Sequence, residues 1–120
     1  MEHDRRQLGI AAEERAAQFL IAAGLEVLQR NYRCKMGELD LIARHGNTLV
    51  IAEVRMRSSA QFGGAAASIT WHKRRRIVRA TRHLLARHPG LQRCVVRFDA
   101  VLIDGNDHTI EWIRGAFDAY

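Results

Sequence analysis

The pattern of apolar and polar positions predicts two helices and five strands. A helical period runs through residues 11–23 and again through residues 70–88, and the runs end at the helix-stopping residues Gly24 and Pro89. Apolar runs rich in Val, Ile and Leu predict strands at residues 25–32, 37–44, 48–57, 94–103 and 109–113. The order α-β-β-β-α-β-β predicts one α/β domain over residues 1–120, a mixed β-sheet flanked by helices. The small, Gly-rich residues 58–67 predict a loop.

Two neighbouring predicted strands carry acids where an apolar strand normally excludes them. Asp40 lies in one and Glu53 in the next, and burying an unpaired charge is costly. A turn of two or four residues around His45–Asn47 makes opposing residue numbers add to an odd total, as Asp40 and Glu53 do. Either turn therefore places both acids on one face, within reach of one ion. The opposite face is predicted to pack a core and carries Leu39, Leu41, Val50, Ala52 and Val54.

Paired carboxylates favour a metal site. Mg²⁺ is typically bound by one or two carboxylates together with water and phosphate. A structural role is the alternative, in salt bridges with nearby arginines, and spacing alone does not decide between the two. The arginines available are Arg55, Arg57 and Arg97.

The first helix supplies a third acid. At about 100° per residue, Glu13 falls inside the apolar arc and is expected to face the sheet, whereas Glu14 falls at its polar edge and is expected to face water. The alternative for Glu13 is an acid near a helix N-terminus that is stabilised by the helix dipole.

The charge of the chain favours a polyanionic partner. The 19 Lys and Arg residues against 13 Asp and Glu give a net charge of +6 and a pI near 10.3. The second predicted helix contains no acid, and Arg75, Arg79 and Arg82 form its outer face, which can bind a phosphate backbone or can simply be solvated. Lys73 falls on the inward arc, from which it either extends to solvent or reaches the acids. Trp71 is expected to pack, with stacking on an unpaired base as the alternative.

Other features exclude several classes of function. No apolar run reaches the ~18 residues of a membrane span, and the polar N-terminus is not that of a signal peptide. Cys34 and Cys94 lack metal-binding spacing and are expected to be reduced, buried or half-buried residues of a cytoplasmic protein. There is no P-loop, GxGxxG or HExxH motif, so nucleotide, dinucleotide and zinc sites are unsupported.

A set of short motifs between about Gly9 and Phe117 resembles the bacterial YraN-type family. The motifs are Glu13-x-x-Ala16-x-x-Phe19-Leu20, Arg30-Asn31-Tyr32-Arg33, Gly37-Glu38-Leu39-Asp40-Leu41-Ile42-Ala43, Glu53-Val54-Arg55-x-Arg57, Phe62-Gly63, Lys73-x-x-Arg76-Ile77 and Arg97-Phe98-Asp99. That family is largely uncharacterised and is assigned to the restriction-endonuclease-like superfamily. Within the superfamily it is similar to archaeal Holliday-junction resolvases. The resemblance therefore implies a restriction-endonuclease-like fold.

The resemblance also implies roles for the acids. Glu13, Asp40 and Glu53 would be ligands of Mg²⁺ (or Mn²⁺), or acids next to those ligands, in an endonuclease that acts on branched DNA. The family and superfamily usually have a lysine at the position of Arg55. Arginine offers charge and hydrogen bonds to phosphate, but it cannot act as a base because it does not deprotonate.

The sequence thus predicts a Mg²⁺-dependent endonuclease-like site. The candidate catalytic residues are Asp40, Glu53, Arg55, Glu13 and Lys73, and the candidate nucleic-acid-binding residues are Arg57, Arg75, Arg79 and Arg82. The alternatives are a non-catalytic nucleic-acid-binding module on a degenerate nuclease scaffold and an interaction protein whose charges are only structural. Related junction enzymes dimerise, and a homodimer here is expected to use the apolar end formed by Trp112, Ile113 and Phe117.

Overall fold

The predicted order of elements is confirmed by a computed structural model, which describes residues 5–57 and 69–119. The elements are α1 (Arg5–Ala22), β1 (Glu26–Cys34), β2 (Gly37–His45), β3 (Thr48–Arg57), α2 (Trp71–Arg87), a 3₁₀ turn η2 (Pro89–Leu91), β4 (Val95–Asp104) and β5 (Ile110–Phe117). Most boundaries lie within two residues of the expected ones. The exceptions are α1, which begins six residues earlier, and β5, which ends four residues later. The predicted loop at residues 58–67 lies outside the described residues.

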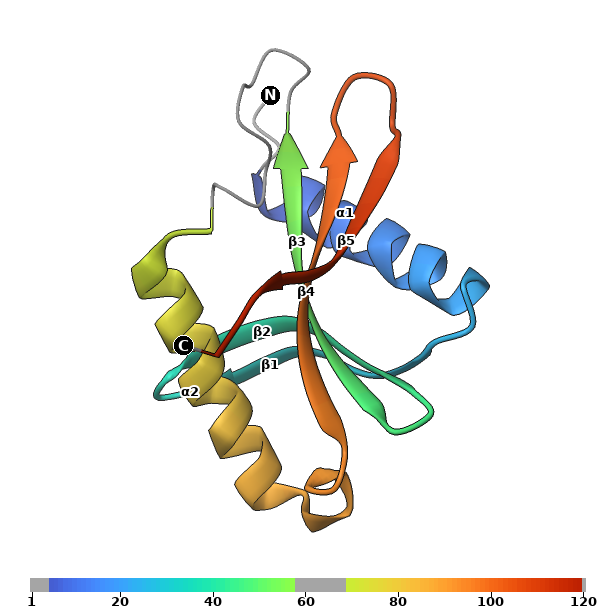
Figure 1. Ribbon diagram of the computed structural model, residues 1–120. Coiled ribbons are helices and arrows are strands. Elements are labelled where there is room, and N and C mark those ends of the chain that lie inside the picture. Colours follow the sequence, from blue (N-terminus) through green and yellow to red (C-terminus); the bar gives the residue numbers. More distant parts are fainter. Residues whose placement is uncertain (1–4, 58–68, 120) are drawn as a thin grey trace.

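The five strands form one mixed sheet in the order β1-β2-β3-β4-β5 (Figure 1). The β3–β4 pair is parallel and the other three pairs are antiparallel. Parallel neighbours need a crossover connection, and the segment containing α2 supplies it. The α/β class is therefore confirmed, and the arrangement is consistent with a restriction-endonuclease-like fold.

Helix α1 ends at a Schellman motif. The Leu25 N–H donates to the Leu20 carbonyl and the Gly24 N–H donates to the Ile21 carbonyl, each at 3.0 Å. Gly24 has φ 98°, which a residue without a Cβ adopts most readily. Leu20 and Leu25 are both buried, so the chain turns directly from α1 into β1 with its apolar side against the sheet.

The two helices cover opposite faces of the sheet (Figure 1). Helix α1 contributes mainly small side chains to its core, which contains Ala12, Ala16, Ala17, Leu20, Leu41, Val50, Ala52 and Val101. Helix α2 packs on the other face, where the core contains Leu39, Ile42, Ile51, Ile77, Leu84, Phe98 and Leu102. Neither helix of the described segments is long and apolar enough to cross a membrane.

One prediction about the core is wrong. Leu39 was expected to pack with Leu41, but it packs in the core of α2, whereas Leu41 packs in the core of α1. The regular alternation of faces therefore breaks at Asp40, between them. Beside this point, Asn31 of β1 has a positive φ of 54°, which shows that the strand pair is locally distorted.

The buried carboxylate of Asp99 ties β4 to β5. Asp99 is fully buried and accepts two hydrogen bonds from Arg97, at 2.8 and 2.9 Å. It also accepts hydrogen bonds from Trp112 Nε1 and from the Gly115 N–H of β5. Asp99 therefore has a structural role, and the hydrogen bond that it accepts from the Gly115 N–H holds β5 beyond residue 113, where the strand is predicted to end.

We expect Asp99→Ala to lower the free energy of unfolding by about 2–4 kcal/mol, because it leaves Arg97 and the Trp112 N–H without their acceptor. Urea denaturation measures the loss. The matched control is Glu111→Ala, which breaks the more exposed Arg57–Glu111 pair and should cost less than about 1 kcal/mol. Equal losses in the two variants would contradict this role for Asp99.

Candidate functional site

The β2–β3 hairpin brings Asp40 and Glu53 together. Its strands are joined by a two-residue turn, with His45 opposite Thr48 and Leu41 opposite Ala52. The numbers of opposing residues add to an odd total, as predicted. Asp40 and Glu53 would therefore form the next pair along the hairpin, after Leu41 and Ala52. Burial and then the charge of Asp40 raise the pKa of Glu53.

The ladder between β2 and β3 ends just before the two acids. Strand β3 stays paired with β4 as far as Arg57, but its pairing with β2 stops at Leu41 and Ala52. Beyond that point the Asp40 Oδ2 accepts a hydrogen bond from the Val54 N–H at 2.9 Å. The side chain of Asp40 thus satisfies a β3 amide beyond the last β2–β3 pair, and this bond fixes the orientation of its carboxylate.

Glu53 is the most constrained acid of the site. Its side chain is 1% exposed, and its Oε1 lies 3.6 Å from the Nζ of Lys73. Its Oε2 is buried without a hydrogen-bond partner. Burial, followed by the charge of Asp40, raises the pKa of Glu53 to about 8, although Lys73 and Arg55 act in the opposite direction.

The other two acids are also perturbed. Burial raises the pKa of Asp40, against the Val54 hydrogen bond and the charges of Lys73 and Arg55. Glu13 is half-buried on α1, as predicted, whereas Glu14 is exposed and pairs with Arg30. Burial and then Asp40 raise the pKa of Glu13, while a side-chain hydrogen bond with Asn31 lowers it.

The acids do not form a three-ligand cluster. Within residues 5–57 and 69–119, no group of three or more His, Cys, Asp or Glu side chains is placed to hold one ion. Glu13 instead feels the charge of Asp40 and has a side-chain hydrogen bond with Asn31. Asn31 is not among the predicted site residues, although it belongs to the motif Arg30-Asn31-Tyr32-Arg33 and is an amide residue, tolerant of positive φ, inside a strand.

Two cations lie beside the acids. Lys73 reaches Glu53 from α2, so of its two predicted placements the structure shows the one that faces the acids, with 42% of its side chain still exposed. Arg55 lowers the pKa of both Asp40 and Glu53 through its charge. Its Nε is buried and has no hydrogen-bond partner. The site therefore combines two carboxylates with two cations that come from different elements.

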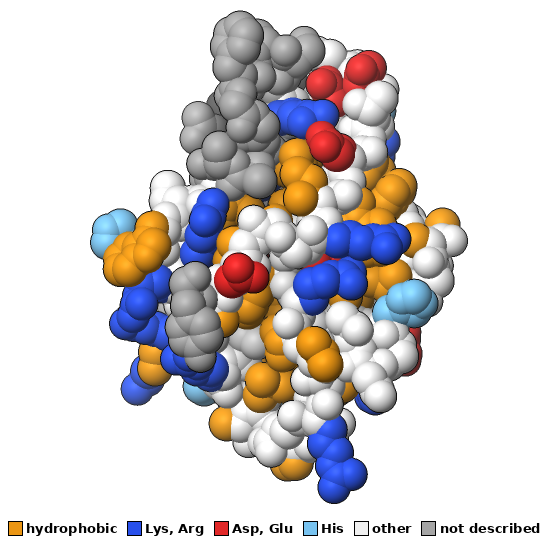
Figure 2. All heavy atoms as spheres, viewed as in Figure 1, with side chains coloured by type: hydrophobic (Ala, Val, Ile, Leu, Met, Phe, Trp, Pro, Cys, Tyr) orange, Lys and Arg blue, Asp and Glu red, His pale blue; other side chains and the backbone are white. Residues whose placement is uncertain are grey.

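The remaining predicted arginines are dispersed. Arg75, Arg79 and Arg82 are exposed on α2, and Figure 2 shows Lys and Arg side chains gathered over this helix, at the left of the view. Arg57 instead pairs with Glu111 at 2.9 Å. The packing role expected for Trp71 is wrong, since 62% of Trp71 is exposed and the Arg75 guanidinium lies 4.9 Å from the centre of its ring.

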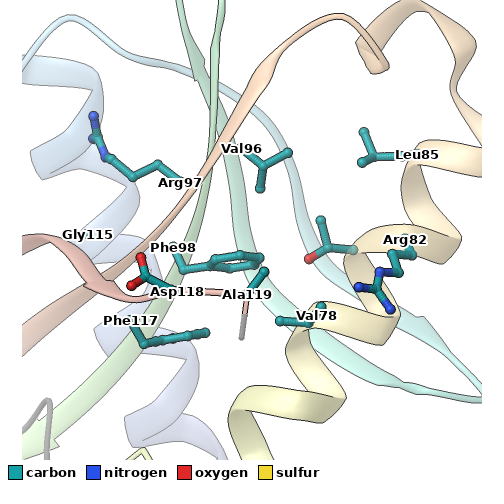
Figure 3. A pocket seen from close by; sticks show the side chains of 11 residues that line it. Val78, Arg82, Leu85, Val96, Arg97, Phe98, Gly115, Phe117, Asp118 and Ala119 are labelled. Carbon is teal, nitrogen blue, oxygen red and sulfur yellow. The ribbon is translucent and has the colours of Figure 1, made fainter.

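A separate pocket of about 290 Å³ lies between α2 and the strands β4 and β5 (Figure 3). Phe98 and Phe117 stack in its wall with ring centroids 5.0 Å apart. Of the predicted site residues, only Arg82 lines it. The predicted dimer end is largely internal, because Phe117 is buried here and the half-buried Trp112 packs against Phe19 and donates to Asp99.

The chain belongs to a family described as "Uncharacterised protein family UPF0102", whose sequence model matches residues 12–103. A UPF0102 protein of Nitrosomonas europaea is 58% identical, covering 92% of both chains. A UPF0102 protein of Methylobacillus flagellatus is 51% identical, covering 95% of this chain and 99% of its own length. One from Legionella pneumophila is 42% identical, covering 95% and 97%. These matches confirm the family resemblance found in the motifs.

We expect the stability of the metal-free protein to fall as pH rises from about 4.5 to about 8. In this window the folded protein keeps a proton on Glu53 that the unfolded chain has lost, so the slope is at most about 1.4 kcal/mol per pH unit. Glu53→Gln should remove this pH dependence and be more stable than the parent at about pH 8. The difference in the free energy of unfolding should shrink towards about pH 5.

Urea denaturation in a chelating buffer, repeated across this pH range, measures the effect. Glu26→Gln is the matched control, because Glu26 is exposed on β1 and its substitution should leave the pH dependence unchanged. Parallel pH profiles for the parent and Glu53→Gln would show that Glu53 does not hold its proton in the folded state.

Proposed function

We propose that this protein is a metal-dependent endonuclease that hydrolyses phosphodiester bonds in nucleic acid, with DNA as the expected substrate. One observation carries the proposal. In the described part of the chain, two buried side-chain atoms lack a hydrogen-bond partner, Glu53 Oε2 and Arg55 Nε, and both belong to this one site. An unsatisfied buried polar group costs about 1–3 kcal/mol, so its presence beside perturbed acids points to a ligand.

The donor atoms fit Mg²⁺ or Mn²⁺. These ions take oxygen ligands and are commonly held by one or two carboxylates, with water and phosphate completing the shell. Asp40 and Glu53 would be those carboxylates, and the partnerless Glu53 Oε2 is available as a ligand. Glu13 would support Asp40 from α1. When bound, such an ion supplies a water of lowered pKa and offsets negative charge on the phosphodiester.

The protein's own residues would do the remaining work. Asp40 would keep its orientation through the Val54 N–H, so that its free oxygen points in a fixed direction. Lys73 would orient the attacking water or bind the phosphate, since its exposed ammonium also contacts Glu53. Arg55 would donate to a phosphate oxygen, because its guanidinium stays charged at any pH of interest.

A non-catalytic nucleic-acid-binding module is the second candidate function. Arg55 occupies the position at which the family and superfamily usually have lysine, and the acid-free helix α2 presents an exposed basic face. These features support binding without turnover. The nuclease and the non-catalytic module differ in one respect: in the nuclease, Lys73 performs the catalytic role of the lysine that is absent at position 55.

We expect cleavage of DNA in Mg²⁺ or Mn²⁺ that Asp40→Asn and Glu53→Gln each reduce at least about 100-fold, the scale on which positioned catalytic groups act. Fluorescent duplex, single-stranded, flap and four-way-junction substrates would be compared with and without metal. Glu26→Gln controls for the loss of an acid elsewhere. Salt-sensitive binding without cleavage would instead support the non-catalytic module, and no binding at low salt would exclude both functions.

We expect Lys73→Met to reduce cleavage about 10-fold or more, while Arg55→Lys changes it less than about 3-fold, because the helix lysine already supplies the needed ammonium. Single-turnover rates measure both effects, and circular dichroism checks that each variant is folded. The opposite pattern, in which Arg55→Lys creates cleavage in an inactive parent, would show that the parent is a degenerate nuclease.

A further inference from the structure

A cleft adjoins the acid pair on the α2 side of the sheet. It has a volume of about 480 Å³ and lies between the end of the β1–β2 hairpin and the first turns of α2. Lys73 lines it, and the same ammonium lies 3.6 Å from Glu53. The cleft and the acids therefore share a residue, so a ligand in the cleft would lie beside the proposed point of cleavage.

The wall of the cleft is predominantly basic. Arg33, Lys73 and Arg76 line it together with one acid, Glu38. Glu38 lies 3.4 Å from Arg33, and both are exposed, so this pair is weak. The ammonium of Lys73 already pairs with Glu53. Arg76 is the cation of the cleft for which no acidic partner lies within ion-pair distance in the described residues. Such a wall favours a phosphate group.

Gly37 allows Arg76 to lie close to the hairpin. Gly37 is buried with φ 151°, and a Cβ added there would lie 3.4 Å from Arg76 Cβ and 3.7 Å from Arg76 Nε. A larger residue would be strained by this backbone conformation, and its Cβ would already be in van der Waals contact with the arginine. The packing thus holds the stem of Arg76 at the cleft, which lowers the entropy that it loses when it binds an anion.

The cleft also offers groups that suit a base. His72 lines it, and the His72 ring lies 5.1 Å, centroid to centroid, from the exposed ring of Trp71. Cys34 and Ile77 add apolar surface. Aromatic and imidazole rings stack on unpaired bases with little preference for sequence. A cationic wall and a ring at one cleft match the two halves of a nucleotide.

We propose that this cleft binds one unpaired nucleotide of the strand to be cut, with its phosphate against Lys73 and Arg76 and its base against His72. The position of that nucleotide next to the scissile bond rests on the proposed function. The volume of the cleft, about 480 Å³, suits a nucleotide, because pockets for small ligands occupy about 300–1,000 Å³. A base that stays stacked inside a duplex cannot enter such a cleft. The preferred substrates are therefore single strands, overhangs and flaps.

The test is binding without metal, where no cleavage interferes. Fluorescence anisotropy in chelating buffer would compare a single-stranded oligonucleotide with the blunt duplex of the same sequence. Arg76→Ala should weaken single-strand binding about 10-fold and reduce the salt slope by about 0.7, the value for one phosphate contact. His72→Ala should weaken it by about 5- to 100-fold, the range for one stacked base, while duplex binding changes less than about 2-fold.

Arg87→Ala is the matched control, because Arg87 is an exposed arginine at the other end of α2. It should leave single-strand binding within about 2-fold of the parent. Trp71 fluorescence gives an independent readout, because the Trp71 ring lies next to His72. The fluorescence should change when a single strand binds but not when the duplex binds. This signal should be lost in His72→Ala.

The outcomes separate this proposal from the proposed function. If Glu53 is needed for cleavage but Arg76→Ala binds single strands as well as Arg87→Ala does, the cleft proposal is overturned and the nuclease remains. If Arg76→Ala and His72→Ala lose only single-strand binding and no variant or parent cleaves, the cleft stands and the nuclease is overturned. Equal losses for single strand and duplex would also overturn the cleft proposal.

Discussion

The site depends on one constraint, which is that the carboxylate of Glu53 lies in the middle strand of the sheet and has almost no contact with water. Helices cover both faces of β3, so a charge there cannot be hydrated. The protein keeps it there through an ammonium that reaches in from α2, and through a raised pKa that allows the carboxyl to be neutral. The β2–β3 ladder ends just before this acid, where the Asp40 side chain takes the place of a strand partner for the Val54 N–H.

The shared face of Asp40 and Glu53 was predictable from the sequence, because side chains alternate between the two faces of a strand. Any short turn of even length places Asp40 and Glu53 on one face, and the structure has such a turn. The element order was predictable for a similar reason, since Gly24 and Pro89 end the helical runs and the apolar runs are distinct. The inward direction of Glu13 also followed from helical periodicity.

The rest depended on tertiary geometry that no local pattern contains. Periodicity placed Lys73 on the inward arc, but only the packing of α2 on the sheet decides whether a long flexible side chain meets an acid or solvent. Leu39 packs on the unexpected side because the strands are distorted near Asp40. Trp71 is exposed although Ile69, two residues earlier, is buried in the core of α2, a difference that a helical wheel does not show.

Two buried acids of this fold differ in how completely their oxygens are satisfied, and the difference supports the proposed role of Glu53. Asp99 accepts four hydrogen bonds, from Arg97, Trp112 and Gly115, so both of its oxygens are satisfied. Glu53 has a single ion pair at 3.6 Å, and its second oxygen has no partner. Packing alone would favour replacement of Glu53 by an apolar residue, since a buried carboxyl group with an unsatisfied oxygen only destabilises the fold. Its unsatisfied oxygen is therefore the feature of the fold that most favours the proposed metal site.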